Sequence, residues 1–303
     1  MSNAQTDHHY SEGKYALHHE EEYVEIFYRR WQVRNPRGDV LIIHGIGEHS
    51  GRYDFVAETL NAAGFSVMVP DLRGHGKNQQ AKGYIGSMEA LMRDIRKAHR
   101  QMSDQLHRPF EPDPQPVPLF LYGHSFGGLV ALKFAFDNAY LFNGVIITSP
   151  ALRIAIKTAS WKTALGKLVG KFFPKLGFNN GILPEHLSDD PEVIQQVQKD
   201  KLMHSKVTPS AFFGMTEQGQ WCLDNASQYN DELPTLIMHG DQDQVTDHQA
   251  SIQFCDKAPD CCQLKIWENG KHELHQMTFR RQVLEHIIRF QNTCIHEENL
   301  NTD

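Results

Sequence analysis

The chain has 303 residues, of which 40% are hydrophobic and 22% are charged, as is ordinary for a globular protein of one large or two small domains. Its formal net charge of −7 at pH 7 argues against nucleic acid as the main partner. The chain has no long apolar run at its start or later, so we expect it to have no signal peptide and no transmembrane helix.

The first part of the chain alternates predicted strands with a predicted helix. Residues 1–20 are predicted to be a polar leader, partly left by a cleaved tag, because "SNA" follows the first methionine. The partial alternation of 23–33 favours a strand. The continuous apolar runs 39–45 and 65–71 are typical of strands that are buried on both faces. Between them, residues 52–64 have helical spacing and end at a glycine.

The alternation continues over the rest of the chain. Residues 87–106 are predicted to form a helix with Ser87 as its N-cap, and the proline-rich stretch 109–118 a loop. The later predicted elements are strand 119–123, helix 126–138, strand 144–148, strand 234–240, helix 247–257, strand 262–268 and a helix over about 273–292. This order indicates an α/β fold with a mainly parallel central sheet and helices on both faces.

One segment interrupts the alternation. Residues 151–230 carry helical patterns and no clear strand, so we predict that they are a helical lid inserted into the core. The core itself is predicted to comprise residues 21–150 and 231–293. Residues 294–303 are predicted to be a disordered tail.

The stretch "LYGHSFGGLV" places a serine between two glycines, after a predicted strand and before a predicted helix. A sharp turn at this position needs small residues, here Gly123 and Gly127, and exposes the hydroxyl of Ser125 at the helix N-terminus. The free N–H groups and positive dipole end of that helix stabilise a developing oxyanion. We therefore predict that Ser125 is a nucleophile, the alternative being a tight turn with an incidental serine.

A serine nucleophile needs a base, and the base needs a carboxylate that orients it. His272 is the first histidine after the last predicted strand and is the predicted base, whereas His275 is expected on the surface or in a second layer. Asp241 and Asp243 follow an earlier strand, and the residues alone leave both open as the carboxylate.

The turn in "HGIGEHSGRY", residues 44–53, follows a predicted strand and is flanked by glycines. Such a turn can direct a backbone N–H at the serine. We expect the N–H groups of Ile46 and Phe126 to form an oxyanion hole. A turn that only closes a strand–helix junction is the alternative, and the two interpretations are compatible.

Neither the acidic residues nor the cysteines suggest a metal. The stretch "DQDQVTD" lacks the glycine and glutamate of a calcium loop. The cysteines are odd in number and fit neither a disulfide framework nor a zinc site: Cys222, Cys255, Cys261, Cys262 and Cys294. A reducing, cytoplasmic setting is the simplest prediction.

Three motifs, "HGIGEHSGRY", "VPDLRGHGKN" and "LYGHSFGGLVAL", together resemble the monoacylglycerol lipase and lysophospholipase branch of the α/β-hydrolases. The resemblance covers about residues 25–150 and 233–290 and implies an α/β-hydrolase fold, a Ser-Asp-His triad and no cofactor. The family pattern G-x-x-D implies that Asp243 is the carboxylate. Phe126 departs from the methionine that the family often has after the serine, and the lid matches less clearly.

The beginning of the lid is basic. Residues 151–184 contain no acidic residue and six basic ones: Arg153, Lys157, Lys162, Lys167, Lys171 and Lys175. One helical face, predicted to line or cover the substrate pocket, carries Trp161, Leu165, Leu168 and Phe172. A basic amphipathic helix of this kind can lie on an anionic lipid surface, or it can simply pack on the core.

The sequence therefore predicts a serine hydrolase that cleaves esters of single-chain lipids, monoacylglycerols or lysophospholipids, through an acyl-enzyme. A small-ester carboxylesterase or an acyltransferase on the same fold, and a non-catalytic ligand-binding protein, are the alternatives. Ser125 argues against dehalogenases and epoxide hydrolases, which have an aspartate at this position. The expected partners are a lipid ester and, transiently, a membrane surface, and no oligomeric state is predicted.

Overall fold

A single eight-stranded sheet organises the computed structural model, which describes residues 8–19, 22–105, 117–155 and 172–301. From one edge to the other its strands are β1 (His8–His19), β2 (Glu22–Val33), β4 (Phe65–Pro70), β3 (Gly38–Ile43), β5 (Leu119–His124), β6 (Gly144–Thr148), β9 (Thr235–Gly240) and β10 (Cys262–Trp267). The strands from β4 to β10 are parallel, whereas β2 is antiparallel to both β1 and β4. The predicted α/β fold is confirmed.

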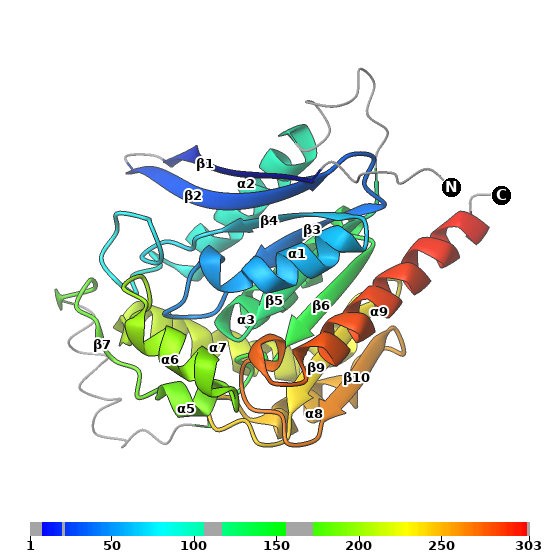
Figure 1. The fold of residues 1–303 in the computed structure, drawn as a ribbon. Coiled ribbons are helices and arrows are strands. Elements are labelled where there is room, and N and C mark those ends of the chain that lie inside the picture. The colour runs from blue at the N-terminus through cyan, green and yellow to red at the C-terminus, as the bar shows by residue number, and fades with distance from the viewer. Residues whose placement is uncertain (1–7, 20–21, 106–116, 156–171, 302–303) are drawn as a thin grey trace.

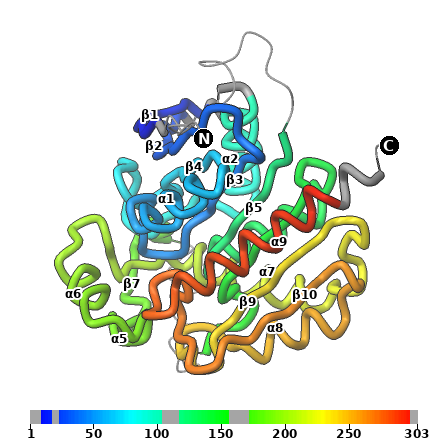
Figure 2. Tube along the Cα trace, turned by 45° about the vertical axis from the view of Figure 1, so that its right-hand side comes forward, coloured from blue at the N-terminus to red at the C-terminus, as the bar shows by residue number. Residues whose placement is uncertain are grey.

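Helices cover both faces of the sheet, as Figures 1 and 2 show. The described α-helices are α1 (Asp54–Ala62), α2 (Met88–Gln105), α3 (Phe126–Asn138), α5 (Pro184–Leu187), α6 (Pro191–Lys199), α7 (Pro209–Asp224), α8 (His248–Cys255) and α9 (Arg280–Asn301). Short 3-10 helices span Ser50–Tyr53, Ala139–Leu141, Ala226–Gln228 and Leu274–Gln276. Helices α1 and α9 pack on one face, and α2, α3, α7 and α8 on the other.

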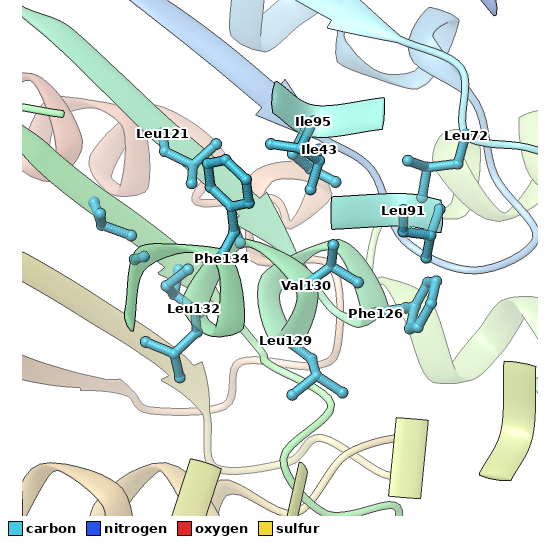
Figure 3. Packing of buried hydrophobic residues seen from close by; sticks show 14 of the residues in the cluster. Ile43, Leu72, Leu91, Ile95, Leu121, Phe126, Leu129, Val130, Leu132 and Phe134 are labelled. Carbon is cyan, nitrogen blue, oxygen red and sulfur yellow. The ribbon is translucent and has the colours of Figure 1, made fainter. Parts of the chain in front are cut away.

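Strand β3 shows why the central strands are continuously apolar. Val40 and Ile42 pack in the core on the α1 and α9 side, and Leu41 and Ile43 in the core on the α3 side. All four side chains are fully buried, and each stabilises the fold by about 1.5–3 kcal/mol relative to an exposed one. Figure 3 shows the second core, where α3 packs against β3, β5 and α2. This packing fixes the N-terminal end of α3 relative to the sheet.

The N-terminal leader differs from the prediction. Residues 8–19 form β1, which pairs with β2 along its whole length, so the predicted polar leader over 1–20 is wrong for these residues. Only one end of the strand is apolar: Tyr15 and Leu17 are buried in the core, whereas Glu12 and Lys14 are exposed. This apolar pattern is too short to predict a strand from the sequence. Pairing with β2 stabilises β1 where its own side chains do not.

The C-terminal end also differs. Helix α9 continues to Asn301, so the predicted disordered tail over 294–303 is wrong as far as this residue. Cys294 is buried against the sheet together with Ile287 and Phe290. Packing of this apolar stripe stabilises the helix beyond the point at which its sequence becomes polar.

The insertion between β6 and β9 is mainly helical in its described part, but it also holds a small antiparallel sheet. Strands β7 (Phe178–Asn179) and β8 (Lys206–Val207) form this pair, which the sequence did not reveal. Helix α7 packs on α3 and α8, and its buried residues belong to the main core. The part that covers the ends of the strands is therefore formed by α5, α6 and the segment that follows them (Figure 1). Among the described helices, none has the length and apolar character needed to span a membrane.

Candidate active site

Ser125 lies at the turn between β5 and α3, where it precedes the first helical residue. Its backbone has φ 55° and ψ −118°, a conformation that costs a residue with a side chain about 1–3 kcal/mol. A Cβ atom at Gly127 would overlap the carbonyl oxygen of Ile43, and one at Gly123 would overlap Gly127. Both glycines are therefore required for the close approach of β3, β5 and α3, as the motif predicts.

Ser125 is the first member of a line of three hydrogen-bonded side chains. Nε2 of His272 lies 2.8 Å from Oγ of Ser125, although the two residues are 147 positions apart in the sequence. Nδ1 of His272 lies 2.7 Å from Oδ2 of Asp243. The structure thus brings together a hydroxyl, an imidazole and a carboxylate in one hydrogen-bonded line, the arrangement in which a base can remove the proton of a serine.

Asp241 and His275, the other two candidates from the sequence, lie outside this hydrogen-bonded line. Asp241 follows β9 as well, but its Oδ1 atom is buried without a hydrogen-bond partner among the described residues. Of the two positions expected for His275, the surface is excluded, because its side chain is fully buried and its ring stacks on Tyr53 at a centroid distance of 5.0 Å. The short helix Leu274–Gln276 directs this side chain into the core.

Burial and nearby charge shift the pKa values of His272 and Asp243 in opposite directions. Burial disfavours the charged form of His272, but the carboxylate of Asp243 outweighs it and raises the pKa of the imidazole. Burial likewise opposes ionisation of Asp243, yet His272 and a hydrogen bond from His239 hold the pKa of this carboxyl well below its usual range. Asp243 is therefore an anion that stabilises a positive charge on His272.

The loop after β3 lies against the serine. Gly45 approaches so closely that a Cβ atom there would be 3.1 Å from Cβ of Ser125. Oε1 of Glu48 holds the turn by accepting hydrogen bonds from the N–H of Gly45 and, at 2.9 Å, from the hydroxyl of Tyr53. Ile46 lines the same cavity as Ser125, and Phe126 is the first residue of α3, whose N–H has no intrahelical partner. Ile46 therefore shares the cavity with Ser125, and Phe126 directly follows Ser125 at the helix N-terminus.

A cavity of about 300 Å³ opens onto Ser125 and His272. Its lid side is lined by five apolar residues, Ile182, Pro184, Leu187, Val197 and Met203, and by five polar ones, Asn180, Gln198, Asp200, His204 and Ser205. Of the predicted lining residues, Phe172 is 65% exposed and does not line the cavity. Trp161, Leu165 and Leu168 lie outside the described residues. Helical periodicity identifies side chains that share a face, but not the surface on which that face packs.

Sequence reasoning missed a buried group of charges beside the cavity. Glu48 and Glu273 both line it, and Arg52 forms an ion pair with Glu273. Burial, followed by the nearby charge of Glu273, raises the pKa of Glu48 to about 7. Glu48 and Arg52 belong to the motif "HGIGEHSGRY", in which only the glycines were interpreted.

The lid is also hydrogen-bonded to the loop after β3. The backbone N–H of His204 donates to the carbonyl oxygen of Gly47 at 2.9 Å. Nε2 of His49 lies 2.7 Å from Oδ2 of Asp200. Gly47 has φ +82°, and a Cβ atom there would overlap the carbonyl oxygen of His204, so the contact depends on this glycine. The expected oxyanion loop and the lid therefore pack as one unit.

A parallel α/β sheet with a serine at a strand–helix elbow, and a carboxylate and histidine at later strand ends, defines an α/β-hydrolase. Comparison with known proteins agrees, since the model of the family described as serine aminopeptidase, S33 matches residues 34–277. An uncharacterised abhydrolase domain-containing protein of Dictyostelium discoideum is 34% identical over 266 residues, which are 86% of this chain and 27% of that protein. The chain thus spans about a quarter of that relative's length.

Two other relatives are matched over most of their length. A monoglyceride lipase homolog of Monkeypox virus is 30% identical over 257 residues, 84% of this chain and 88% of that protein. The crystal structure of a Paleococcus ferrophilus monoacylglycerol lipase superposes with a TM-score of 0.74 at 28% identity, over 88% of this chain and 99% of that one. The chain belongs to the serine aminopeptidase, S33 family, within the monoacylglycerol lipase branch of the α/β-hydrolases, and is a serine ester hydrolase.

Proposed function

We propose that this protein hydrolyses carboxylic esters of single-chain lipids, with monoacylglycerols as the first candidates. The observation that carries the proposal is the hydrogen-bonded line of Ser125, His272 and Asp243, which opens into a cavity lined by both apolar and polar side chains. The apolar lid residues suit an acyl chain, and the polar groups, Glu48 among them, suit a hydroxylated leaving group. The names of the viral and archaeal relatives support this substrate class.

The proposed mechanism has two half-reactions. Oγ of Ser125 attacks the ester carbonyl carbon while Nε2 of His272 takes its proton, and the N–H groups of Ile46 and Phe126 bind the oxyanion. The intermediate collapses, and His272 returns the proton to the leaving alcohol. Water then attacks the acyl-enzyme with His272 again as the base, which releases the fatty acid and restores Ser125. Asp243 orients His272 and stabilises its positive charge throughout.

The proposed mechanism predicts an acid limb in the pH profile. His272 must be neutral to accept a proton, so kcat/KM falls as the pH drops through its pKa. Because that pKa is raised from the ordinary value of 6.5, the limb is expected above pH 6.5. Hydrolysis of an uncharged ester between pH 5 and 9 measures it. A limb at or below 6.5 would show that another group controls the reaction.

The acyl-binding role of the lid side predicts a chain-length effect. Replacing Met203 by tryptophan is expected to fill the apolar side and lower kcat/KM for long-chain esters by about 10- to 100-fold. Acetyl esters, which do not reach this wall, should change by less than about twofold. Tyr140→Trp is the matched control, because Tyr140 is exposed outside the lid and does not line the cavity. Equal losses for short and long esters would place the acyl chain elsewhere.

The substrate class itself is tested with a panel. It contains short and long p-nitrophenyl esters, monoacylglycerols, lysophosphatidylcholine and an aminoacyl p-nitroanilide, each with and without added glycerol. Turnover that rises with chain length supports the proposal. Activity confined to acetyl and butyryl esters would indicate a carboxylesterase, cleavage of the anilide a peptidase, and ester formation with glycerol an acyltransferase.

We further propose that the lid contacts a membrane surface transiently. Large exposed apolar side chains gather in the described part of the lid: Phe172, Phe173, Leu176, Phe178 and Leu183. Lys175 lies in the same stretch, whereas Arg153 is paired with Asp247. Such a surface, which is close in sequence to the cavity-lining residue Ile182, is suited to taking up an acyl chain from a bilayer.

The membrane proposal is tested by vesicle sedimentation. The double change Phe172→Ser and Phe173→Ser is expected to weaken binding to anionic vesicles by at least about tenfold, because each phenyl ring contributes apolar area. Tyr140→Ser is the control, since Tyr140 is 78% exposed but follows the opposite end of α3. Unchanged binding by the double variant would contradict the proposal.

A cytoplasmic location is also proposed, and it is supported by five cysteines that are all free.

A further inference from the structure

A second histidine contacts the carboxylate of Asp243. His239 is the residue before the last of β9, and its side chain is fully buried. Its Nε2 atom lies 3.1 Å from Oδ2 of Asp243, and its Nδ1 atom lies 2.8 Å from Oγ of Ser251 on α8. His239 therefore connects the sheet, a covering helix and the proposed triad, although the mechanism above does not use it.

These two contacts determine the tautomer of His239. An ionised carboxylate only accepts hydrogen bonds, whereas a serine hydroxyl can donate or accept. Nε2 of His239 must therefore carry the proton that is donated to Asp243, and Nδ1 accepts the proton of Ser251. Burial lowers the pKa of His239 despite the nearby Asp243, while the neighbouring His272 and His248 act in the same direction as burial. The ring is therefore a neutral donor and does not compete with His272 as a base.

The hydrogen bonds of Asp243 show what this donor adds. Oδ1 accepts the backbone N–H groups of Val245 and Thr246 at 2.7 and 3.0 Å. Oδ2, which faces His272, is also contacted by the hydroxyl of Thr246 at 2.8 Å. That hydroxyl has a single proton and also lies 3.2 Å from the carbonyl oxygen of Ser149 and 3.2 Å from Nε2 of His239, whose N–H its oxygen can accept in part. His239 is thus the N–H donor that holds Oδ2 from the side of the sheet.

We propose that His239 is a positioning residue, whose Nε2–H fixes Oδ2 of Asp243 in line with Nδ1 of His272 and whose own tautomer is fixed by Ser251. A carboxylate that is held at both oxygens cannot rotate away when His272 gains and loses its proton. This inference rests on the proposed role of Asp243.

The tautomer is tested in the unmodified protein by ¹⁵N NMR of the histidine rings. The expected result is a neutral His239 ring protonated at Nε2 from pH 7 to 9. A ring protonated at Nδ1, or one that titrates in this range, would overturn the proposal. This measurement does not depend on enzyme activity, so it separates the inference from the proposed function.

The functional effect is tested with two variants. His239→Leu removes the donor and is expected to lower kcat by about 10- to 100-fold with little change in KM. His239→Gln places an amide N–H near the position of Nε2 and is expected to recover kcat to within about fivefold of the original protein. A role in packing alone would make glutamine the worse replacement, because it would bury an amide in place of an apolar group.

The pH profile gives a second readout. Without the donor, the charge of Asp243 is less neutralised and favours protonated His272 more strongly, so the acid limb of His239→Leu is expected to move upward by about 0.5 pH unit. The groups that face His272 and set this limb are Asp243, Glu273, Glu48, His124 and His275. A folded His239→Leu protein with kcat within twofold and an unmoved limb would refute the proposal. If the unmodified protein shows no serine-dependent hydrolysis, the proposed function has failed instead.

Discussion

Replacement of Ser125 by alanine is expected to lower kcat for ester hydrolysis by about four to six orders of magnitude and to leave the fold intact. The change removes the attacking oxygen and its 2.8 Å contact with His272, but no packing, because the side chain is small. Residual turnover would come from water bound beside the expected oxyanion hole. Long incubations with a p-nitrophenyl ester, together with thermal unfolding, measure both effects.

A matched serine serves as the control. Ser103 is exposed on α2, and Ser103→Ala is expected to change kcat by less than about twofold. If Ser125→Ala retained more than about one hundredth of the original activity in a folded protein, the nucleophile would have to be another group.

Replacement of Asp243 by asparagine is expected to lower kcat by about 10³- to 10⁴-fold. An amide cannot stabilise the charge that His272 gains, and it can present a donor where Nδ1–H needs an acceptor. Asp241→Asn provides a comparison two positions away. The Oδ1 atom of Asp241 lacks a hydrogen-bond partner among the described residues, and Asp243 already occupies the position beside Nδ1 of His272, so we expect a change of less than about threefold.

Both variants are compared at saturating substrate and at the same pH, on the plateau above the acid limb of the original protein. Thermal unfolding shows whether a loss of activity reflects a loss of folded protein. The opposite ranking, with Asp241→Asn the more damaging change, would assign the carboxylate to Asp241.

The central elements of the fold were predictable because their burial pattern is local. Helix 126–138 and strand 144–148 coincide with α3 and β6, since continuous apolar runs reflect burial on both faces of a parallel sheet. β1 and the end of α9 were not predictable. Their stability comes from pairing with β2 and from packing on the finished sheet, which no short window of sequence contains.

The candidate site also has parts that the sequence predicts and parts that it does not. The elbow sequence and strand order were sufficient to predict that Ser125 and His272 meet, whereas the choice of Asp243 over Asp241 required a family resemblance. Glu48 and His239 were missed because their importance depends on burial and on partners distant in the sequence. Phe172 does not line the cavity, because periodicity does not say which surface a lid face meets.

The separation of 147 positions between Ser125 and His272 also has a consequence for folding. Closing so long a loop costs conformational entropy, which the chain recovers only when the strands between these residues have paired. The arrangement of Ser125, His272 and Asp243 therefore requires the completed sheet. We expect it to form late in folding, even where single helices form early. During synthesis, a growing chain has the serine long before it has the base. It acquires the ability to cleave esters only after His272 has been added and β9 and β10 have joined the sheet.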